Sequence, residues 1–116
     1  MLEYTSCLFA TVVMHAYERD VHMYQYIFSV ITVLSVLNYT TRNPLVRIVD
    51  TVCAHLAYLF VIMETSKLVH SDNEWLLIFP AAVLMIWVFE AQEDTRHAAL
   101  HAIAVIGLHA YLYYLY

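Results

Sequence analysis

Apolar residues fill five long blocks of this chain, and short polar breaks separate the blocks. The blocks cover residues 2–17, 23–40, 44–68, 75–89 and 97–116. Because the apolar residues run continuously instead of alternating with polar ones, they favour helices over the strands of a barrel. We therefore expect an all-α protein with about five helices.

The length of the blocks and the composition both point to a membrane. A membrane-crossing helix needs about 20 apolar residues, which the second, third and fifth blocks supply, whereas the first and fourth are short enough to be tilted or partly interfacial. Hydrophobic residues make up 63% of the chain and charged residues 13%, against about 25% charged residues in a typical soluble domain. No polar break is long enough to separate domains. We predict that residues 1–116 form a single, multi-pass integral membrane bundle.

Local signals refine the helix ends. Pro44 suits the first turn of the third helix, and Asp94 or Thr95 can cap the fifth. Pro80 lies inside the fourth block and is expected to kink it. The chain begins with Met-Leu-Glu, which lacks the basic leader of a signal peptide, so the first block is interpreted as a helix.

Charge gives the orientation and excludes one class of partner. The formal net charge of −5 offers no basic surface for nucleic acid. With five crossings, Arg42, Arg47 and Arg96 lie on one side of the membrane, and Arg19 and Lys67 lie on the other. The positive-inside rule then places the three-arginine side in the cytoplasm.

Four polar residues inside the predicted spans fall at one depth. Ionisable groups within a membrane are costly and mark candidate functional sites. The second helix ends, and the third and fifth begin, on the same side of the bilayer. At the helical rise of 1.5 Å per residue, the four residues lie roughly 5 to 10 Å below that surface. They are Ser35, Asp50, His97 and His101.

The spacing of these residues suggests a metal site and leaves alternatives. His97 and His101 are four residues apart and share a helix face, as when one helix supplies two imidazoles to a metal. Two interfacial histidines near a helix end would show the same spacing. Asp50 needs a partner, which could be the imidazoles, a metal or Arg47, three residues earlier on the same helix.

The order Ser35, Asp50, His97 and His101 resembles the CREST superfamily of membrane hydrolases, which includes alkaline ceramidases and adiponectin receptors. The resemblance covers roughly residues 24–116. It implies a zinc ion surrounded by a serine and a histidine of the second helix, an aspartate of the third and two histidines of the last. It also implies cleavage of the amide bond of a lipid such as ceramide by zinc-activated water.

The chain departs from this family in two respects. Tyr39 stands where the family has the histidine of the second helix, so a site expected to hold three imidazoles and a water would have two. One helix, instead of three, separates the third helix from the last, which keeps those two helices parallel. Asp50 could complete the zinc ligands directly, because two histidines and a carboxylate form a known catalytic set.

Two functions follow as hypotheses. In a zinc-dependent lipid amidase, His97 and His101 hold zinc, Asp50 is a ligand or proton shuttle, and Ser35 orients the water or stabilises the oxyanion. In a non-catalytic protein of the same fold, the bundle serves as an assembly subunit, a membrane-remodelling factor or a lipid-binding protein. Tyr39 favours the second hypothesis. Oligomerisation could rebuild a missing wall of the substrate pocket.

The remaining cysteines and histidines receive structural interpretations. Cys7 and Cys53 are expected to be small buried side chains, although Cys53 shares a helix face with Asp50. His55 is expected to face away from Asp50. His109 is expected to be a buried, hydrogen-bonded histidine.

Residues near the predicted membrane surfaces complete the picture. Three further histidines are expected to be interfacial: His15, His22 and His70. Six aromatic residues are expected to form belts at the membrane surfaces, and they are Trp75, Trp87, Tyr111, Tyr113, Tyr114 and Tyr116.

Overall fold

The computed structural model describes residues 6–90 and 94–116, with the side chains of residues 6–88 and 98–116. These residues form five α-helices and one 3₁₀ helix, so the all-α class is confirmed. The elements are α2 (Phe9–Glu18), α3 (His22–Thr41), α4 (Pro44–Leu68), η1 (Glu74–Leu77), α5 (Ile78–Glu90) and α6 (Asp94–Tyr114). The predicted third block matches α4 at both ends, and the second matches α3 within one residue at each end.

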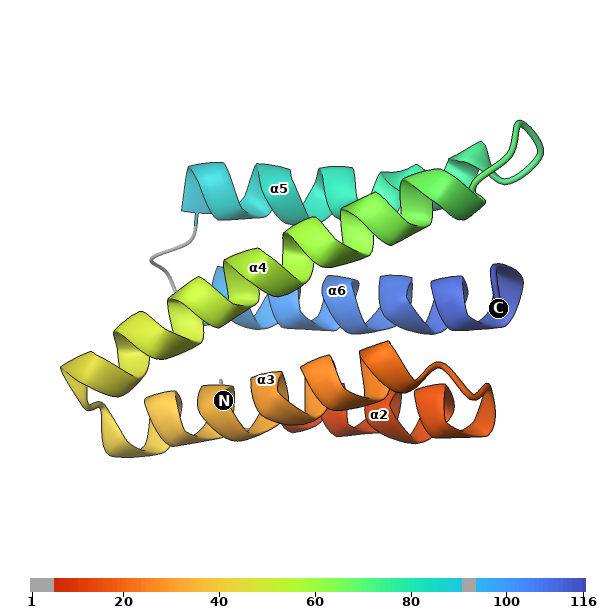
Figure 1. Ribbon diagram of the computed structural model, residues 1–116. Coiled ribbons are helices and arrows are strands. Elements are labelled where there is room, and N and C mark those ends of the chain that lie inside the picture. Colours follow the sequence, from red (N-terminus) through yellow and green to blue (C-terminus); the bar gives the residue numbers. More distant parts are fainter. Residues whose placement is uncertain (1–5, 91–93) are drawn as a thin grey trace.

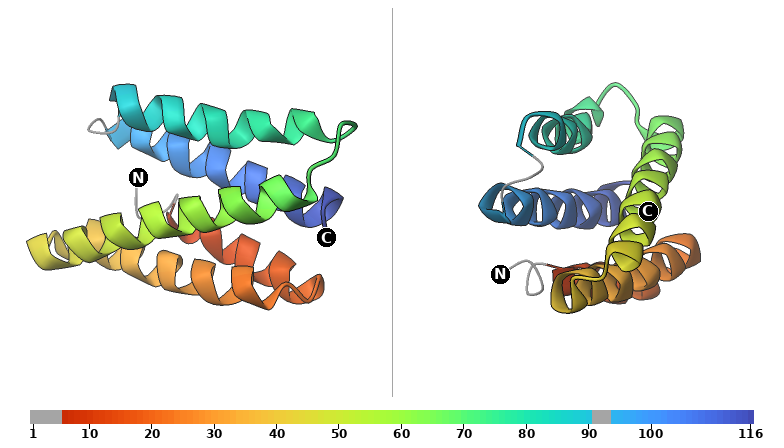
Figure 2. Two further views of the ribbon diagram at one scale, coloured as in Figure 1. Left: turned by 45° about the horizontal axis from the view of Figure 1, so that its top comes forward. Right: turned by 90° about the vertical axis from the view of Figure 1, so that its left-hand side faces the viewer.

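The helices pack as two pairs with one long helix across them (Figure 1). Helix α2 packs against α3, α5 packs against α6, and α2 also contacts α6. Helix α4 leaves α3 at one end and runs diagonally toward α5. Viewed from the end, α5, α6 and the α2–α3 pair lie in successive layers, with α4 along one side of all three (Figure 2). The diagonal course of α4 leaves room between it and the other helices.

The turn between α3 and α4 is fixed by three consecutive residues. Arg42 closes α3 in the left-handed region with φ 56°, which few residues other than glycine adopt, and its N–H donates to the Asn38 carbonyl at 3.1 Å. Asn43 caps α4 by accepting a hydrogen bond from the Leu45 N–H at 2.9 Å. Pro44 is the first residue of α4, as predicted. This tight turn brings the end of α3 beside the start of α4.

Pro80 has a different role from the kink that the sequence suggested. It is the third residue of α5, directly after η1, so it lies in the first turn and not in the interior of a long helix. A proline cannot donate to the carbonyl four residues earlier, which here is that of Leu76. The hydroxyl of Tyr111 donates to that carbonyl at 3.0 Å instead. Tyr111 thereby fastens α6 to the junction of η1 and α5.

Helices α5 and α6 approach each other closely at Gly107, the single glycine of the chain. A Cβ added there would lie 2.7 Å from the Cβ of Phe79 and 2.9 Å from its Cγ. Small residues permit this kind of close helix packing in membrane proteins. Gly107 therefore sets how α6 sits against α5.

The outer surface of the bundle is strongly apolar. By length and composition, one described helix, α4, could cross a membrane, and 74–88 and Ala98–Tyr114 form shorter apolar segments. Exposed apolar side chains form stripes along α3 and α4, where a soluble bundle would carry polar ones. They are Met23, Tyr26, Val30, Val33, Leu37, Leu45, Ile48, Val49, Val52, Leu56, Leu59 and Met63.

Candidate functional site

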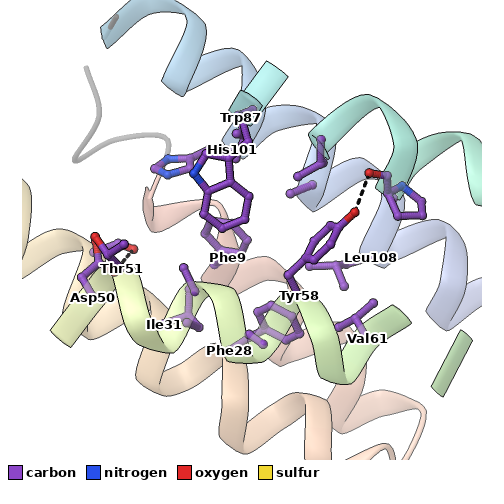
Figure 3. Close-up of a pocket in the computed structure, with 18 of the residues that line it drawn as sticks. Phe9, Phe28, Ile31, Asp50, Thr51, Tyr58, Val61, Trp87, His101 and Leu108 are labelled. Atoms are coloured by element: carbon purple, nitrogen blue, oxygen red, sulfur yellow. Dashed lines mark hydrogen bonds between the residues drawn. The ribbon is translucent and has the colours of Figure 1, made fainter. Parts of the chain in front are cut away.

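A cavity of about 670 Å³ lies between α3, α4, α5 and α6. Most of its wall is apolar, and Phe9 of α2 closes one part of it (Figure 3). Polar side chains from α3, α4 and α6 also line it, and all but His101 come from the helix ends on either side of the α3–α4 turn. These residues are Ser35, Asn38, Tyr39, Arg42, Arg47, Asp50, Thr51 and His101. The cavity thus has a long apolar part and a polar end.

Asp50 is the acidic residue among these polar side chains, and it is only 6% exposed. Its Oδ1 accepts a hydrogen bond from the Ser35 hydroxyl at 3.0 Å, and its Oδ2 accepts one from the Asn38 amide at 3.0 Å. These charge-assisted hydrogen bonds join α3 to α4. They bring Ser35 and Asp50 into direct contact. The described partners of the carboxylate are Ser35 and Asn38, and not Arg47, which lines the cavity nearby.

His101 approaches the same cavity from α6. Its side chain is 5% exposed, and its ring centre lies 5.5 Å from that of Phe9 and 6.0 Å from that of Tyr39. Tyr39 therefore lies beside His101. The backbone of His97 belongs to the first turn of α6, but its side chain lies outside the described residues.

The chemistry of these donors can be compared with that of a zinc site. Among the described side chains, no group of three or more His, Cys, Asp and Glu residues is placed to hold a metal. A catalytic zinc has three protein ligands and a water, so Asp50 and His101 need His97 to complete the set. Hydrogen bonds from Ser35 and Asn38 do not by themselves exclude coordination by Asp50, because each carboxylate oxygen has two lone pairs. Together, Asp50, His101 and His97 have the residue types of a catalytic zinc site with two histidines and one carboxylate.

Sequence reasoning missed Asn38 and the position of Arg42 on the cavity wall. Asn38 lies three residues beyond Ser35 on the same face of α3, and Arg42 follows directly after the end of that helix. An amide one turn from a serine, within an otherwise apolar stretch, is the signal that could have identified Asn38. Only the pairing with Asp50 shows that the amide belongs to the site.

Several structural interpretations need correction. Cys7 is exposed, and not buried as expected. Cys53 packs in part against the apolar core and is not among the cavity-lining residues. His55 faces away from Asp50, as predicted, because it is exposed and its Nδ1 lies 2.7 Å from the Thr51 carbonyl oxygen.

The predicted aromatic belts are correct only in part. Tyr111 is 2% exposed and lines the cavity, and Trp87 also lines it. The hydroxyl of Tyr58 crosses from α4 to donate to the Pro80 carbonyl at 2.9 Å, which closes the apolar part of the cavity (Figure 3). The remaining belt residues are exposed, as expected, and they are Trp75, Tyr113, Tyr114 and Tyr116.

A second polar cluster lies between α2 and α6. The Nδ1 atoms of His15 and His109 are 2.8 Å apart, and the Nε2 of His109 lies 2.8 Å from the Thr11 hydroxyl oxygen. Both histidines are half-buried. The prediction that His109 is hydrogen-bonded is confirmed, whereas His15 is not the isolated interfacial residue that its position near a loop suggested. His22 and His70 are exposed, as expected.

Comparisons with protein-family models, with curated proteins and with solved structures find no match for this chain. The cavity has space for an apolar chain, and its polar end offers a carboxylate, an imidazole, hydrogen-bond donors and two guanidinium groups. This combination suits a ligand with an apolar tail and a polar head.

Proposed function

We propose that this chain is a multi-pass membrane protein that binds an N-acyl lipid, such as ceramide, in the cavity and hydrolyses its amide bond with the help of zinc. The proposal rests on one observation: a single, largely apolar cavity is lined both by the hydrogen-bonded pair Ser35–Asp50 and by His101. Its volume of about 670 Å³ is within the range of small-molecule sites, about 300 to 1,000 Å³. An acyl chain in the apolar part would bring its amide group to the polar end.

The distribution of apolar residues supports a membrane location for the whole bundle. Ser35, Asn38 and Asp50 are buried, while the outward faces of α3 and α4 are apolar. Helices α3, α4 and α6 have 20, 25 and 21 residues, which corresponds to roughly 30 Å or more at the helical rise and matches the hydrocarbon thickness of a bilayer. Lipid tails would cover the outward stripes that water would otherwise contact.

The roles of the side chains follow from their positions. In this proposal, His97 and His101 would hold zinc, with Asp50 either as a third ligand or as the proton shuttle, and the bound ion would supply a water of lowered pKa. As the shuttle, Asp50, whose carboxylate is fixed by the hydrogen bonds from Ser35 and Asn38, accepts a proton from the attacking water and returns it to the leaving amine. The apolar wall excludes bulk water and aligns the acyl chain. The products are a fatty acid and an amine.

A second candidate, a non-catalytic lipid-binding protein of the same fold, is favoured by two specific observations. Both oxygens of Asp50 already accept hydrogen bonds that join α3 to α4. Tyr39 lies beside His101 where the resemblance implies a histidine. In this alternative, the polar cluster stabilises the bundle and the cavity carries lipid without cleaving it.

Metal analysis of detergent-purified protein distinguishes the two candidates. His101→Ala and His97→Ala are each expected to hold about one zinc ion fewer per chain than the parent, as for a single catalytic site. Hydrolysis of a panel of N-acyl lipids should be lost in the same variants. Equal zinc content in a folded parent and both variants, without hydrolysis, would reject the hydrolase, and retained lipid binding would then support the second candidate.

A further inference from the structure

The cluster of Thr11, His15 and His109 lies apart from the cavity. His15 is in the last turn of α2, next to the loop that begins at Arg19. His109 lies eight residues after His101 on α6, which is about 12 Å along the helix axis. Two imidazoles that meet between apolar helices are a candidate site of their own, because polar groups at such positions are costly to bury.

The hydrogen bonds of Thr11 determine the tautomer of His109. The Thr11 hydroxyl donates its single hydrogen to the Leu8 carbonyl at 2.6 Å, so it can only accept from the Nε2 of His109. A neutral His109 then carries its proton on Nε2 and has a lone pair on Nδ1. That lone pair is directed at His15, whose Nδ1 donates to it across 2.8 Å.

The two rings meet edge to edge. Their centres are 5.0 Å apart and their planes differ by 21°, while the nitrogens are 2.8 Å apart. The separation of the centres exceeds that of the nitrogens by about the two ring radii, so both Nδ1 atoms lie close to the line between the centres. If His15 shifts its proton to Nε2, both Nδ1 lone pairs converge on the same point without any change in net charge.

We propose that His15 and His109 bind a first-row transition-metal ion, such as Zn²⁺, between their Nδ1 atoms, and that the ion clips α2 to α6. Imidazole is a preferred ligand of zinc, copper and nickel. With Zn–N bonds of about 2.0 to 2.1 Å in tetrahedral geometry, the nitrogens would be about 3.3 Å apart. The separation of 2.8 Å must therefore widen by about 0.5 Å, and the two rings must tilt so that their lone pairs meet at the tetrahedral angle. Two water molecules would complete the four-coordinate site.

Thr11 supports the site through its hydrogen bond to Nε2, the ring nitrogen of His109 that does not face His15. A metal-bound histidine usually donates its other ring N–H to a fixed acceptor, which holds the ring and its tautomer in place. The Thr11 hydroxyl is such an acceptor for Nε2. This site is independent of the proposed hydrolase, because none of its three residues lines the cavity.

The test measures Zn²⁺ binding by the full chain in detergent, with His97→Ala and His101→Ala present to remove the first proposed site. His15→Asn is the central variant, because the asparagine amide can donate from the place of Nδ1 and keep the hydrogen bond to His109, yet it binds metal poorly. We expect Zn²⁺ affinity to fall at least tenfold in His15→Asn and about tenfold in Thr11→Val, as for outer ligand-supporting groups. The matched control, His22→Asn, changes an exposed histidine and should leave the affinity unchanged.

Two outcomes would overturn the metal site: no Zn²⁺ binding by the background protein, or unchanged affinity in His15→Asn. If His15→Asn fails to fold, electron paramagnetic resonance of Cu²⁺ bound to the background protein gives the answer. Coordination by two imidazole nitrogens supports the site, and coordination by one or none rejects it. A background that binds Zn²⁺ here, while the parent hydrolyses no lipid, would retain this inference and reject the proposed function alone.

Discussion

Asp50 and His109 are polar residues inside an apolar bundle, but their side chains have different kinds of hydrogen-bond partners. Asp50 is a charged acceptor that receives two donors from the neighbouring helix, and its cluster opens onto a cavity. His109 belongs to a directional chain of neutral groups that runs from His15 to Thr11. The first arrangement leaves space for a ligand beside it, whereas the second fills the contact between two helices.

This difference has an energetic consequence. Hydrogen bonds to a charged group contribute about 1.5 to 3 kcal/mol, compared with about 0.5 to 1.5 kcal/mol between neutral groups. Removing a partner of Asp50 also leaves a buried charge with fewer donors. Substitutions at the cavity should therefore cost more stability than matched substitutions between α2 and α6.

The largest expected effect is on lipid hydrolysis by Asp50→Asn. The amide keeps the size of the side chain and one acceptor oxygen, but it cannot take up the proton of the attacking water, a role that contributes about 10²- to 10⁴-fold to a rate. Hydrolysis of an N-acyl lipid should fall by that amount, whereas His15→Asn should hydrolyse at the parent rate. Asp72→Asn, in an exposed loop, is the charge-matched control. Parent-level hydrolysis by Asp50→Asn would remove the carboxylate from the mechanism.

The next largest effect is on the free energy of unfolding, which can be compared between the Asp50 cluster and the His15–His109 cluster. Ser35→Ala and Asn38→Ala should each lower the free energy of unfolding by about 1.5 to 3 kcal/mol, because each removes a hydrogen bond to a buried charge. Thr11→Val removes two hydrogen bonds, but both are between neutral groups and the side chain is exposed, so it should cost about 0.5 to 1.5 kcal/mol. Reversible unfolding in mixed detergent measures all three. Equal losses at the two clusters would mean that Asp50 is neutral in the folded protein.

Zinc affinity in Tyr39→His is expected to change by a smaller amount. The Tyr39 ring lies 6.0 Å from that of His101, so a histidine there could supply the imidazole that the resemblance implies. We expect zinc to bind about tenfold more tightly, which corresponds to about 1.4 kcal/mol. Tyr26→His is the matched control, on the outward face of α3, and should leave the affinity unchanged. An unchanged affinity in Tyr39→His would show that position 39 is not directed at the metal.

The two clusters also differ in how much of each can be predicted from the sequence. Helix boundaries and the shared depth of Ser35 and Asp50 follow from apolar block lengths and a fixed rise per residue, which are local quantities. The pairing of His15 with His109 depends on how α2 packs against α6, across 94 residues of sequence, and no local pattern encodes that contact. Asn38 lies between these cases, because its helix face was predictable but its partner was not.

The buried position of Tyr111 also depends on a contact between helices that no local pattern encodes, so the sequence predicts a place at the membrane surface instead. Four tyrosines near the end of the chain fit an aromatic belt, and composition cannot tell which of them points inward. The inward one is the tyrosine whose hydroxyl finds an acceptor, and that acceptor exists because Pro80 lacks an N–H. The inward position of Tyr111 therefore depends on Pro80, which lies in a different helix.

The smallest effect is expected at the hydrogen bond between the Tyr111 hydroxyl and the Leu76 carbonyl, and its dependence on Pro80 can be tested. Tyr111→Phe removes a neutral hydrogen bond and should lower the free energy of unfolding by about 0.5 to 1.5 kcal/mol. In a Pro80→Ala background, the restored N–H of residue 80 can reach the Leu76 carbonyl, so the same substitution should cost less. A double-mutant cycle measures this coupling. If Tyr111→Phe costs the same in both backgrounds, the proline does not create the acceptor for the Tyr111 hydroxyl.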